Sequence, residues 1–361
     1  MKRILLTSLL LSTTCFASFD YSHPAHDEEN FPEDEYCLDL EAGQQPFVLE
    51  IRKIEIDGHP HAFNPSIIRW RGEILLAFRT YLTPRSSYEI EIGLIRLDEE
   101  FSPIGKASFL RFPDRDPSCL SKRQDPRLVE SNGRLWVVYN NVLDLREINP
   151  KLEIRRMLFA EVECDDTGFT AKEPECLYYF DEMKPQRSEK NWVPFDFDGN
   201  LLFSYSLFPH RIMEPLFGTN SCRTVFSHNS PIEWDWGVLR GGTPAIEVDG
   251  KYLAFFHSST NIASCHSEGI LRLHYFMGAF TFSKEPPFAI ERMSPEPITA
   301  HGFYEGKKYK TWKPLHVVFP GGFLVDGPFI WLVYGRQDHE VWITKLDKQG
   351  LLDSLESVSA M

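Results

Sequence analysis

Residues 243–258, TPAIEVDGKYLAFFHS, contain the pattern that decides the fold. A proline begins a short apolar segment, an Asp-Gly pair follows, and a run of aliphatic and aromatic residues completes the unit. The Asp-Gly pair supplies the positive φ angles that a two-residue hairpin turn needs. Proline is tolerated at the start of a strand, where no ladder hydrogen bond is lost. The stretch therefore predicts a β-hairpin whose second strand is buried on both faces.

Four other segments repeat this order of proline, apolar strand, Gly-containing turn and second apolar strand. They are residues 64–79, 125–140, 192–207 and 319–335. The spacing leaves room for two further strands in each unit, expected at residues 90–97, 156–163, 271–282 and 340–346. Repeated units with buried inner strands are typical of β-propellers. We therefore expect an all-β fold, a five-bladed β-propeller, with a β-sandwich of coincidental hairpins as the alternative.

The N-terminal sequence is typical of an exported protein. Lys2 and Arg3 precede a short apolar run that ends at Ala17, which predicts a signal peptide at residues 1–17. A lipid anchor at Cys15 and a simple apolar strand are the alternatives. We expect an acidic leader at 18–45 and the catalytic propeller at 46–361, with no membrane insertion once the signal is removed. The protein would then be periplasmic or secreted, where its other cysteines could form disulfides whose pairing the sequence does not define.

Charge and motifs exclude several classes of function. The formal net charge of −14 argues against nucleic acid as a partner, because nucleic-acid binding demands a basic surface. No dinucleotide fingerprint or Walker loop occurs, so we expect no cofactor. His59 and His61 could be two metal ligands, but no third ligand is evident nearby, and we expect no metal site. The oligomeric state cannot be read from these features.

Polar residues interrupt the apolar pattern at equivalent ends of the units. Read in order, they are Asn64 and Arg79, Asp125 and Asn140, Lys190 and His210, His257, and Arg336 and Asp338. In a propeller these unit ends surround the axial channel, so the side chains are expected to converge. Asn, Asp and Arg side chains grip sugars through hydrogen bonds, and cleavage of a glycosidic bond needs a carboxylic acid. Asp125 is the best-placed acid, and Lys190, His257 and Tyr275 could bind phosphate as the external nucleophile.

Five fragments resemble glycoside hydrolase family 130, the β-mannoside phosphorylases. They are QDPRLV (124–129), EKNWVPF (189–195), GGTPAIEVDGKYLAFFHSS (241–259), HYFMGAF (274–280) and VVFPGG with WLVYGRQD (317–338). The resemblance implies a five-bladed propeller and an inverting reaction of β-linked mannosides with inorganic phosphate, giving α-mannose 1-phosphate. It implies that Asp125 is the proton donor, acting through a sugar hydroxyl. It further implies sugar contacts by Asn64, Arg79 and Asp338 and phosphate contacts by Lys190, His257 and Tyr275.

Two positions depart from the family pattern. Gln124 stands where a Glu is usual, which removes a charge that could tune the pKa of Asp125. No single arginine is the clear counterpart of the one that completes the phosphate site, and Arg155, Arg156 and Arg211 are candidates. Three alternatives therefore stay open: an exported inverting hydrolase of the same fold, a mannosyltransferase, and a non-catalytic glycan-binding propeller. The hydrolase would need a second carboxylate near Asp125.

Overall fold

The computed structural model describes residues 38–82, 89–113, 122–143, 154–165, 168–177, 179–180, 189–306 and 315–358. The predicted signal peptide at 1–17 and the predicted leader up to residue 37 lie outside the described residues. The described part is built mainly of strands, with the α-helix α1 (Lys348–Ser354) and the 3-10 helix η1 (Cys265–Ser267). None of the described helices is long and apolar enough to cross a membrane.

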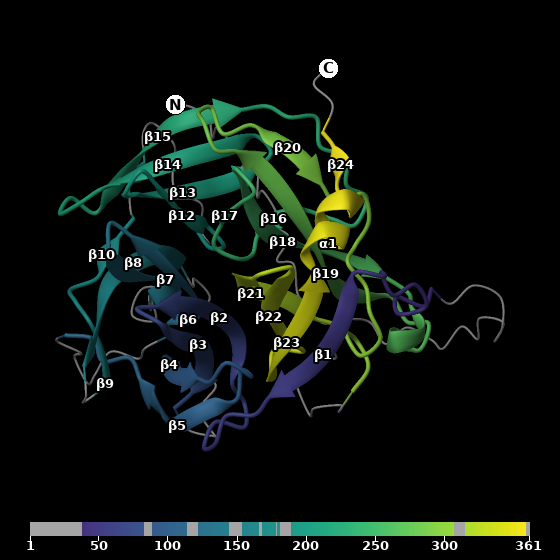
Figure 1. Cartoon of the computed structure of the whole chain (residues 1–361), viewed down its shortest axis with the longest axis horizontal. Helices are drawn as coiled ribbons and strands as arrows, with labels where there is room; N and C mark the ends of the chain where they lie inside the picture. Colours follow the sequence, from purple (N-terminus) through teal and green to yellow (C-terminus); the bar gives the residue numbers. More distant parts are fainter. Residues whose placement is uncertain are drawn as a thin grey trace, which may run out of the picture. The chain divides into compact units, whose positions relative to one another are not determined.

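The strands form five sheets arranged around a common centre (Figure 1). The first sheet contains β2 (Phe63–Trp70), β3 (Glu73–Tyr81), β4 (Ile90–Leu97) and β5 (Pro103–Phe109). The second contains β6 (Gln124–Ser131), β7 (Arg134–Leu143), β8 (Ile154–Asp165), β9 (Gly168–Ala171) and β10 (Glu175–Cys176). The third contains β11 (Tyr179–Phe180), β12 (Val193–Phe197), β13 (Asn200–Leu207), β14 (His210–Leu216) and β15 (Ser221–His228).

The last two sheets complete the ring. The fourth contains β16 (Arg240–Gly241), β17 (Ile246–Val248), β18 (Lys251–Ile262), β19 (Arg272–Ser283), β20 (Ile290–Met293) and β24 (Glu356–Ser357). The fifth contains β21 (Val318–Asp326), β22 (Phe329–Arg336), β23 (Glu340–Asp347) and β1 (Val48–Ile54). Strand β1 pairs antiparallel with β23, so the first strand of the fold completes the last sheet. The five-bladed propeller predicted from the repeats is confirmed, as are the outer strands β4, β8, β19 and β23.

The repeated hairpins follow from their turn residues and their apolar second strands. Asn132-Gly133 and Asp249-Gly250 both have positive φ, 52° and 67° in the first pair and 50° and 80° in the second. These angles are those of the two-residue turn that the sequence predicts. The second strands are buried on both faces, and the buried side chains form five clusters, each shared by two neighbouring sheets. Burial between the blades therefore holds the ring together.

The prolines at the unit starts produce β-bulges. Pairing of the inner strands shifts register between Phe63 and Ser66 in β2 and between Gln124 and Arg127 in β6. Pro65 and Pro126 lie inside these bulges, where the missing N–H costs no ladder hydrogen bond. A bulge re-aims the side chain beside it, and the residues re-aimed here are Asn64 and Asp125.

The folded unit begins earlier than the sequence indicates. We expected an acidic leader through residue 45, but Leu38 onward belongs to the same compact unit as the propeller. Leu40 is buried in the core shared by the fourth and fifth sheets. The buried Glu41 carboxylate accepts hydrogen bonds from the backbone N–H groups of Gly302 (2.8 Å), Tyr304 (2.6 Å) and Glu305 (3.0 Å). The acidic composition of this segment did not indicate that the Glu41 carboxylate is buried, because its hydrogen-bond donors lie far away in the sequence.

The seam between the first and fifth sheets gives a stability prediction. A Cβ atom on Gly321 of β21 would lie 1.7 Å from the carbonyl oxygen of Pro65 in β2. Gly321→Ala is therefore expected to lower the free energy of unfolding by about 1–3 kcal/mol, because one of the two strands must move. Denaturant titration measures this, with Gly43→Ala as the matched control, since nothing lies within 4 Å of a Cβ there. Equal stability of the two variants would contradict this packing.

Candidate active site

Asp125 lies at the centre of a hydrogen-bond network formed by the first two sheets. Its Oδ1 accepts from Asn64 Nδ2 at 2.8 Å and from Arg79 Nη1 at 3.2 Å. Its Oδ2 accepts from Asn140 Nδ2 at 3.2 Å. The carboxylate is 12 % exposed and Arg79 is 15 % exposed, so the ion pair is shielded from bulk water. Side chains from the starts of β2 and β6 and from near the ends of β3 and β7 thus converge at the Asp125 carboxyl group.

The backbone at this network adopts an uncommon conformation. Asn64 has a φ of 47° and Asp125 a φ of 55°, although each precedes a proline. The residue before a proline normally adopts an extended conformation, and positive φ is rare outside glycine. Such strain persists where the surrounding structure enforces it, and it is concentrated at functional sites. The bulges therefore hold Asn64 and Asp125 in the orientation that brings their side chains together.

Arg127 supports the same bulge from within the core. Its guanidinium is buried and donates to the carbonyl oxygens of Asp125 (3.1 Å), Pro126 (3.0 Å) and Gly242. Burial lowers the pKa of Arg127 to about 10, while the charge of Asp125 acts in the opposite direction. At neutral pH Arg127 remains a cation that ties the second sheet to the fourth.

Positive charge holds Asp125 in its ionised form. Burial raises the pKa of Asp125, but the charge of Arg79 and the hydrogen bond from Asn64 outweigh it, with smaller contributions from Arg127 and Lys190. The resulting pKa of Asp125 is about 2. In the ligand-free protein Asp125 is therefore a carboxylate at neutral pH, and it needs a change in its surroundings before it can donate a proton.

A group of cations lies beside Asp125. Lys190 is exposed, but the surrounding protein atoms partly desolvate its ammonium group. This desolvation and the charges of Arg155 and Arg240 lower the pKa of Lys190, whereas the charge of Asp125 raises it. His257 is buried, and burial and the charges of Arg240 and Lys190 lower its pKa well below the usual value. His257 is therefore neutral at pH 7 and can donate or accept a hydrogen bond. Arg240 pairs across the strands with His257 and donates to Ser259 Oγ at 3.0 Å.

Tyr275 and Asp338 complete the group. The Tyr275 ring is stacked on His257, with centroids 5.9 Å apart and planes inclined by 8°. Burial raises the pKa of Tyr275, the charge of Asp338 adds to this, and Arg240 opposes it. Burial also raises the pKa of Asp338, Arg79 opposes this, and Asp125 adds to it. Asp338, like Asn64 and Asp125, has positive φ, at 52°.

The structure brings together the seven side chains to which the sequence assigned a catalytic, sugar-binding or phosphate-binding role. Asn64, Arg79, Asp125, Lys190, His257, Tyr275 and Asp338 are linked by the contacts and electrostatic interactions above. The individual roles given to them stay predictions. Asn64, Arg79 and Asp125 lie near the ends of inner strands, Lys190 and Asp338 lie in the segments that flank such strands, and His257 and Tyr275 lie within the neighbouring strands β18 and β19.

Two further residues expected at the axis do not belong to the network. His210 lies between the third and fourth sheets, where its Nε2 contacts Ser204 Oγ at 3.0 Å and its Nδ1 contacts the Phe288 carbonyl oxygen at 2.6 Å. It begins β14, one strand further out than expected, and burial lowers its pKa to about 4. Arg336 instead forms a buried ion pair with Glu340 at 2.6 Å.

The cation group contains residues that the sequence did not identify securely. Arg155 was one of three candidates, and it lies close enough to Lys190 to lower its pKa. Arg240 was not predicted, although it directly precedes the Gly-Gly-Thr-Pro of the fourth unit. Only the register of β16 against β18 sets Arg240 opposite His257, and no sequence pattern reveals that register.

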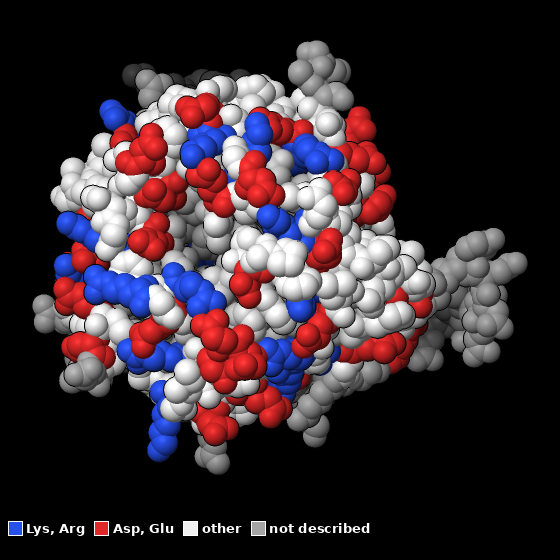
Figure 2. Space-filling view, viewed as in Figure 1, with Lys and Arg blue, Asp and Glu red and all other residues white. Residues whose placement is uncertain are grey.

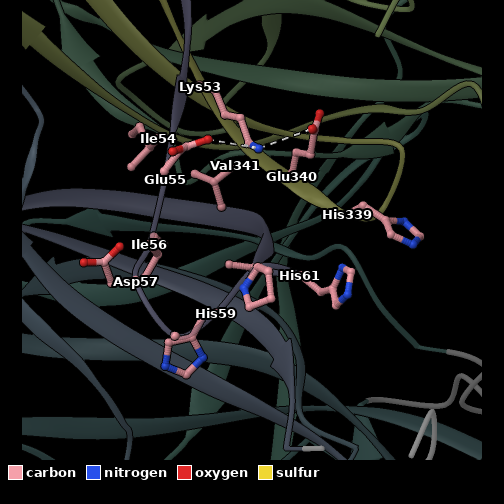
Figure 3. A pocket seen from close by; sticks show the side chains of 13 residues that line it. Lys53, Ile54, Glu55, Ile56, Asp57, His59, His61, His339, Glu340 and Val341 are labelled. Carbon is pink, nitrogen blue, oxygen red and sulfur yellow. Dashed lines mark hydrogen bonds and ion pairs between the residues drawn. The ribbon is translucent and has the colours of Figure 1, made fainter. Parts of the chain in front are cut away.

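A small cavity lies beside the turn that carries Asp338. It has a volume of about 350 Å³ and is lined by residues 53–62 and 339–341. Figure 3 shows Lys53 reaching towards both Glu55 and Glu340, with an Nζ–Oε1 distance of 3.5 Å to each. The rings of His61 and His339 are 5.7 Å apart and nearly perpendicular. Among the described residues no three His, Cys, Asp or Glu side chains are grouped as a metal site would require.

The surface around the centre carries both signs of charge. In Figure 2, Lys and Arg are interspersed with Asp and Glu, and the face is hollowed near the centre around which the sheets lie. The local excess of cations beside Asp125 thus contrasts with the mixed surface.

Comparisons with known proteins find relatives by sequence and by structure. A "Beta-mannosyltransferase 3" from Komagataella phaffii is 28% identical over 160 residues, 40% of this chain and 24% of that protein. The match therefore spans about a quarter of that relative's length. A β-1,2-mannobiose phosphorylase from Listeria innocua has a TM-score of 0.53 at 14% identity, covering 84% of this chain and 92% of its own. A mannose phosphorylase from Leishmania mexicana has a TM-score of 0.55 at 14% identity, covering 86% and 92%.

These structural likenesses show the propeller fold, and the family is shown by the sequence. The family model described as beta-1,4-mannooligosaccharide phosphorylase matches residues 41–357, which include every blade and every residue of the network around Asp125. The chain belongs to glycoside hydrolase family 130.

Proposed function

We propose that the protein is an inverting glycoside phosphorylase that transfers a β-linked mannosyl residue to inorganic phosphate. The observation that carries this proposal is the group of cations beside Asp125. Arg79, Arg127 and Lys190 act on the Asp125 carboxylate, and Arg155 and Arg240 act on Lys190, in a chain whose net charge is −14. Cations and hydrogen-bond donors concentrated at one point favour an anionic co-substrate. No cofactor is required for this reaction.

The proposed step has a simple balance. A phosphate oxygen attacks the anomeric carbon of the scissile mannose from the face opposite the leaving sugar. The bond between that carbon and the glycosidic oxygen breaks, and the oxygen keeps the electron pair and takes a proton from Asp125. In keeping with the resemblance to the family, the proton passes through a hydroxyl of the mannose. Inversion of a β-linkage gives α-mannose 1-phosphate, while Asn64, Arg79 and Asp338 hold the sugar.

The hydrolase alternative would require Asp338 to act as a general base. An inverting hydrolase needs a second carboxylate that is ionised and activates a water molecule. Asp338 is a carboxyl that interacts with Asp125, and burial raises its pKa, which disfavours the charged form of a base. A hydroxyl-binding role suits Asp338 better, because either protonation state can form hydrogen bonds with a sugar.

A product assay separates these functions. Purified protein is incubated with β-1,2- and β-1,4-linked mannosides with and without inorganic phosphate, and mannose and mannose 1-phosphate are quantified. We expect mannose 1-phosphate that forms only with phosphate. Free mannose released at equal rates without phosphate would support the hydrolase. Binding without turnover of any mannoside would support the glycan-binding propeller. Export, which the N-terminal sequence predicts, stays a prediction.

Phosphate is expected to prepare Asp125 for proton donation. Its negative charge offsets the cations that hold the pKa of Asp125 at about 2, so the pKa should rise by about one unit or more. Carboxyl-¹³C NMR across a pH titration measures this, with Asp125→Asn identifying the resonance. The free protein should keep the carboxylate down to about pH 2, whereas the phosphate complex should protonate at higher pH. The same titration curve with and without phosphate would contradict this coupling.

A further inference from the structure

The turn between β22 and β23 holds Asp338 in an uncommon backbone conformation. Gln337 and Asp338 both have positive φ, 54° and 52°. Aspartate tolerates this left-handed region, but a long side chain such as that of Gln337 rarely adopts it. Such a conformation persists only where neighbouring groups enforce it. Two of these groups lie at the ends of the turn, in Arg336 and Glu340.

A buried ion pair closes the base of this turn. Arg336 ends β22, Glu340 begins β23, and the two residues lie opposite each other in the strand register. Arg336 Nε and Nη2 reach Glu340 Oε2 at 2.8 Å and 2.6 Å, and the two side chains are 5% and 4% exposed. The Trp342 Nε1 donates to the same oxygen at 2.9 Å, and its ring lies beside the guanidinium. The pair therefore keeps the two strand ends at a fixed separation.

The same guanidinium binds the segment after β20. Arg336 Nη1 donates to the carbonyl oxygens of Gly302 (2.9 Å) and Glu305 (2.5 Å). The backbone N–H groups of these two residues donate to the buried Glu41 carboxylate, so the segment is held through both its donors and its acceptors. Gly306 leaves room for the guanidinium, because a Cβ atom there would lie 2.3 Å from Arg336 Nη2. The position of Arg336 is thus fixed by segments far away in the sequence.

The turn is also held by its own backbone. The Gln337 N–H donates to the Val317 carbonyl oxygen at 2.9 Å. The His339 N–H donates to the Arg336 carbonyl oxygen at 3.0 Å, which closes the turn. Asp338 lies between these held residues, and its carboxyl is close enough to the candidate active site to interact with it electrostatically. The geometry of the turn therefore sets where this carboxyl lies.

We propose that Arg336 is a positioning residue: with Glu340 it holds the strained turn so that the Asp338 carboxyl can bind a hydroxyl of the sugar. Arg336 acts through Asp338, not by contact with the sugar. The inference rests on the proposed function, in which Asp338 holds the sugar. Arginine suits this task better than lysine, because a planar guanidinium binds a carboxylate and two carbonyl oxygens at once in a fixed geometry.

A double-mutant cycle on the binding of β-1,4- and β-1,2-linked mannobiose tests this role. Every protein carries Asp125→Asn, which removes the proposed acid, and calorimetry gives the Kd. Arg336→Lys keeps the charge beside Glu340 but loses the planar fork, and we expect about 10-fold weaker binding. Asp338→Asn, which tolerates the positive φ, should weaken binding by a similar factor. Because both changes affect the same sugar contact, the double variant should bind about 10- to 20-fold more weakly, whereas independent effects would multiply to about 100-fold.

Two controls separate positioning from a general loss of charge or stability. Lys53→Gln removes a more exposed cation, 3.5 Å from Glu340 Oε1, and should leave mannobiose affinity within about twofold. Leu351→Ala opens a cavity in the core shared by the fourth and fifth sheets, so it should lower the denaturation midpoint without changing affinity. If Arg336→Lys does not fold, Glu340→Gln tests the same ion pair and should show the same non-additivity with Asp338→Asn.

Several results would overturn the proposal. They are losses that multiply in the double variant, unchanged affinity in both Arg336→Lys and Glu340→Gln, an equal loss in Leu351→Ala, and no binding of mannobiose by the Asp125→Asn background. Failure of the proposed function looks different: the non-additive losses would persist while wild-type protein forms no mannose 1-phosphate.

Discussion

Replacing Asp125 by asparagine is expected to lower kcat for mannoside phosphorolysis by about 10²–10⁴-fold, the usual contribution of a general acid. Asparagine keeps the shape of the side chain and tolerates the positive φ of 55° at this position. It also accepts hydrogen bonds, so Asn64 and Arg79 retain a partner. The loss should therefore appear mainly in kcat, with a smaller change in KM for the glycan. Steady-state kinetics at saturating phosphate measure both constants.

The matched control for this prediction is Asp249→Asn. Asp249 has a φ of 50°, nearly the same as Asp125, but it lies in the hairpin turn of the fourth unit with an exposed side chain. The substitution is chemically identical and makes the same demand on the backbone. We expect wild-type kinetics from Asp249→Asn. Activity of Asp125→Asn within tenfold of wild type would rule out Asp125 as the acid.

Replacing Arg240 by glutamine is expected to raise KM for phosphate by about 10- to 100-fold, because a hydrogen bond to a charged group contributes about 1.5–3 kcal/mol. Arg240 acts on Lys190, His257 and Tyr275, so its removal weakens the whole cation group. Since it does not contact Asp125 directly, KM for the glycan should change by less than about threefold. Initial rates over a matrix of phosphate and glycan concentrations give both constants.

Arg223→Gln provides the comparison for this substitution. Arg223 is exposed on β15 and pairs with Glu214 at 2.6 Å, away from the axis. Its loss removes one positive charge from the protein without touching the cation group, and phosphate kinetics should stay as in wild type. The assignment of Arg240 to the phosphate site is wrong if the two variants behave alike, or if glycan KM alone increases.

The fold could be predicted because its signals are local. Each hairpin is encoded in a few adjacent residues, and Asn132-Gly133 and Asp249-Gly250 specify their turns without help from the rest of the chain. The position of the site also followed, because equivalent ends of repeated units must meet at the axis. Asn64 and Asp125 could thus be paired from the amino-acid sequence alone.

The residues whose positions could not be predicted are placed by contacts that the sequence pattern does not show. Arg240 precedes the repeating unit, and only the register of β16 against β18 sets it opposite His257. His210 was misplaced because β14 starts immediately after a two-residue turn, which moves it outward into the core. Glu41 was assigned to the acidic leader because its hydrogen-bond donors, at residues 302–305, lie far away in the sequence. None of these contacts produces a periodic pattern in the amino-acid sequence.

The reaction carried out in ¹⁸O-labelled water tests the central proposal most directly. Phosphorolysis transfers the mannosyl group to a phosphate oxygen, so the mannose 1-phosphate formed should contain no solvent oxygen at its anomeric position. NMR should show the α-anomer as the first product, with one phosphate consumed for each glycosidic bond broken. Release of ¹⁸O-labelled mannose as the first product would show that water is the nucleophile and would contradict the role given to the cations beside Asp125.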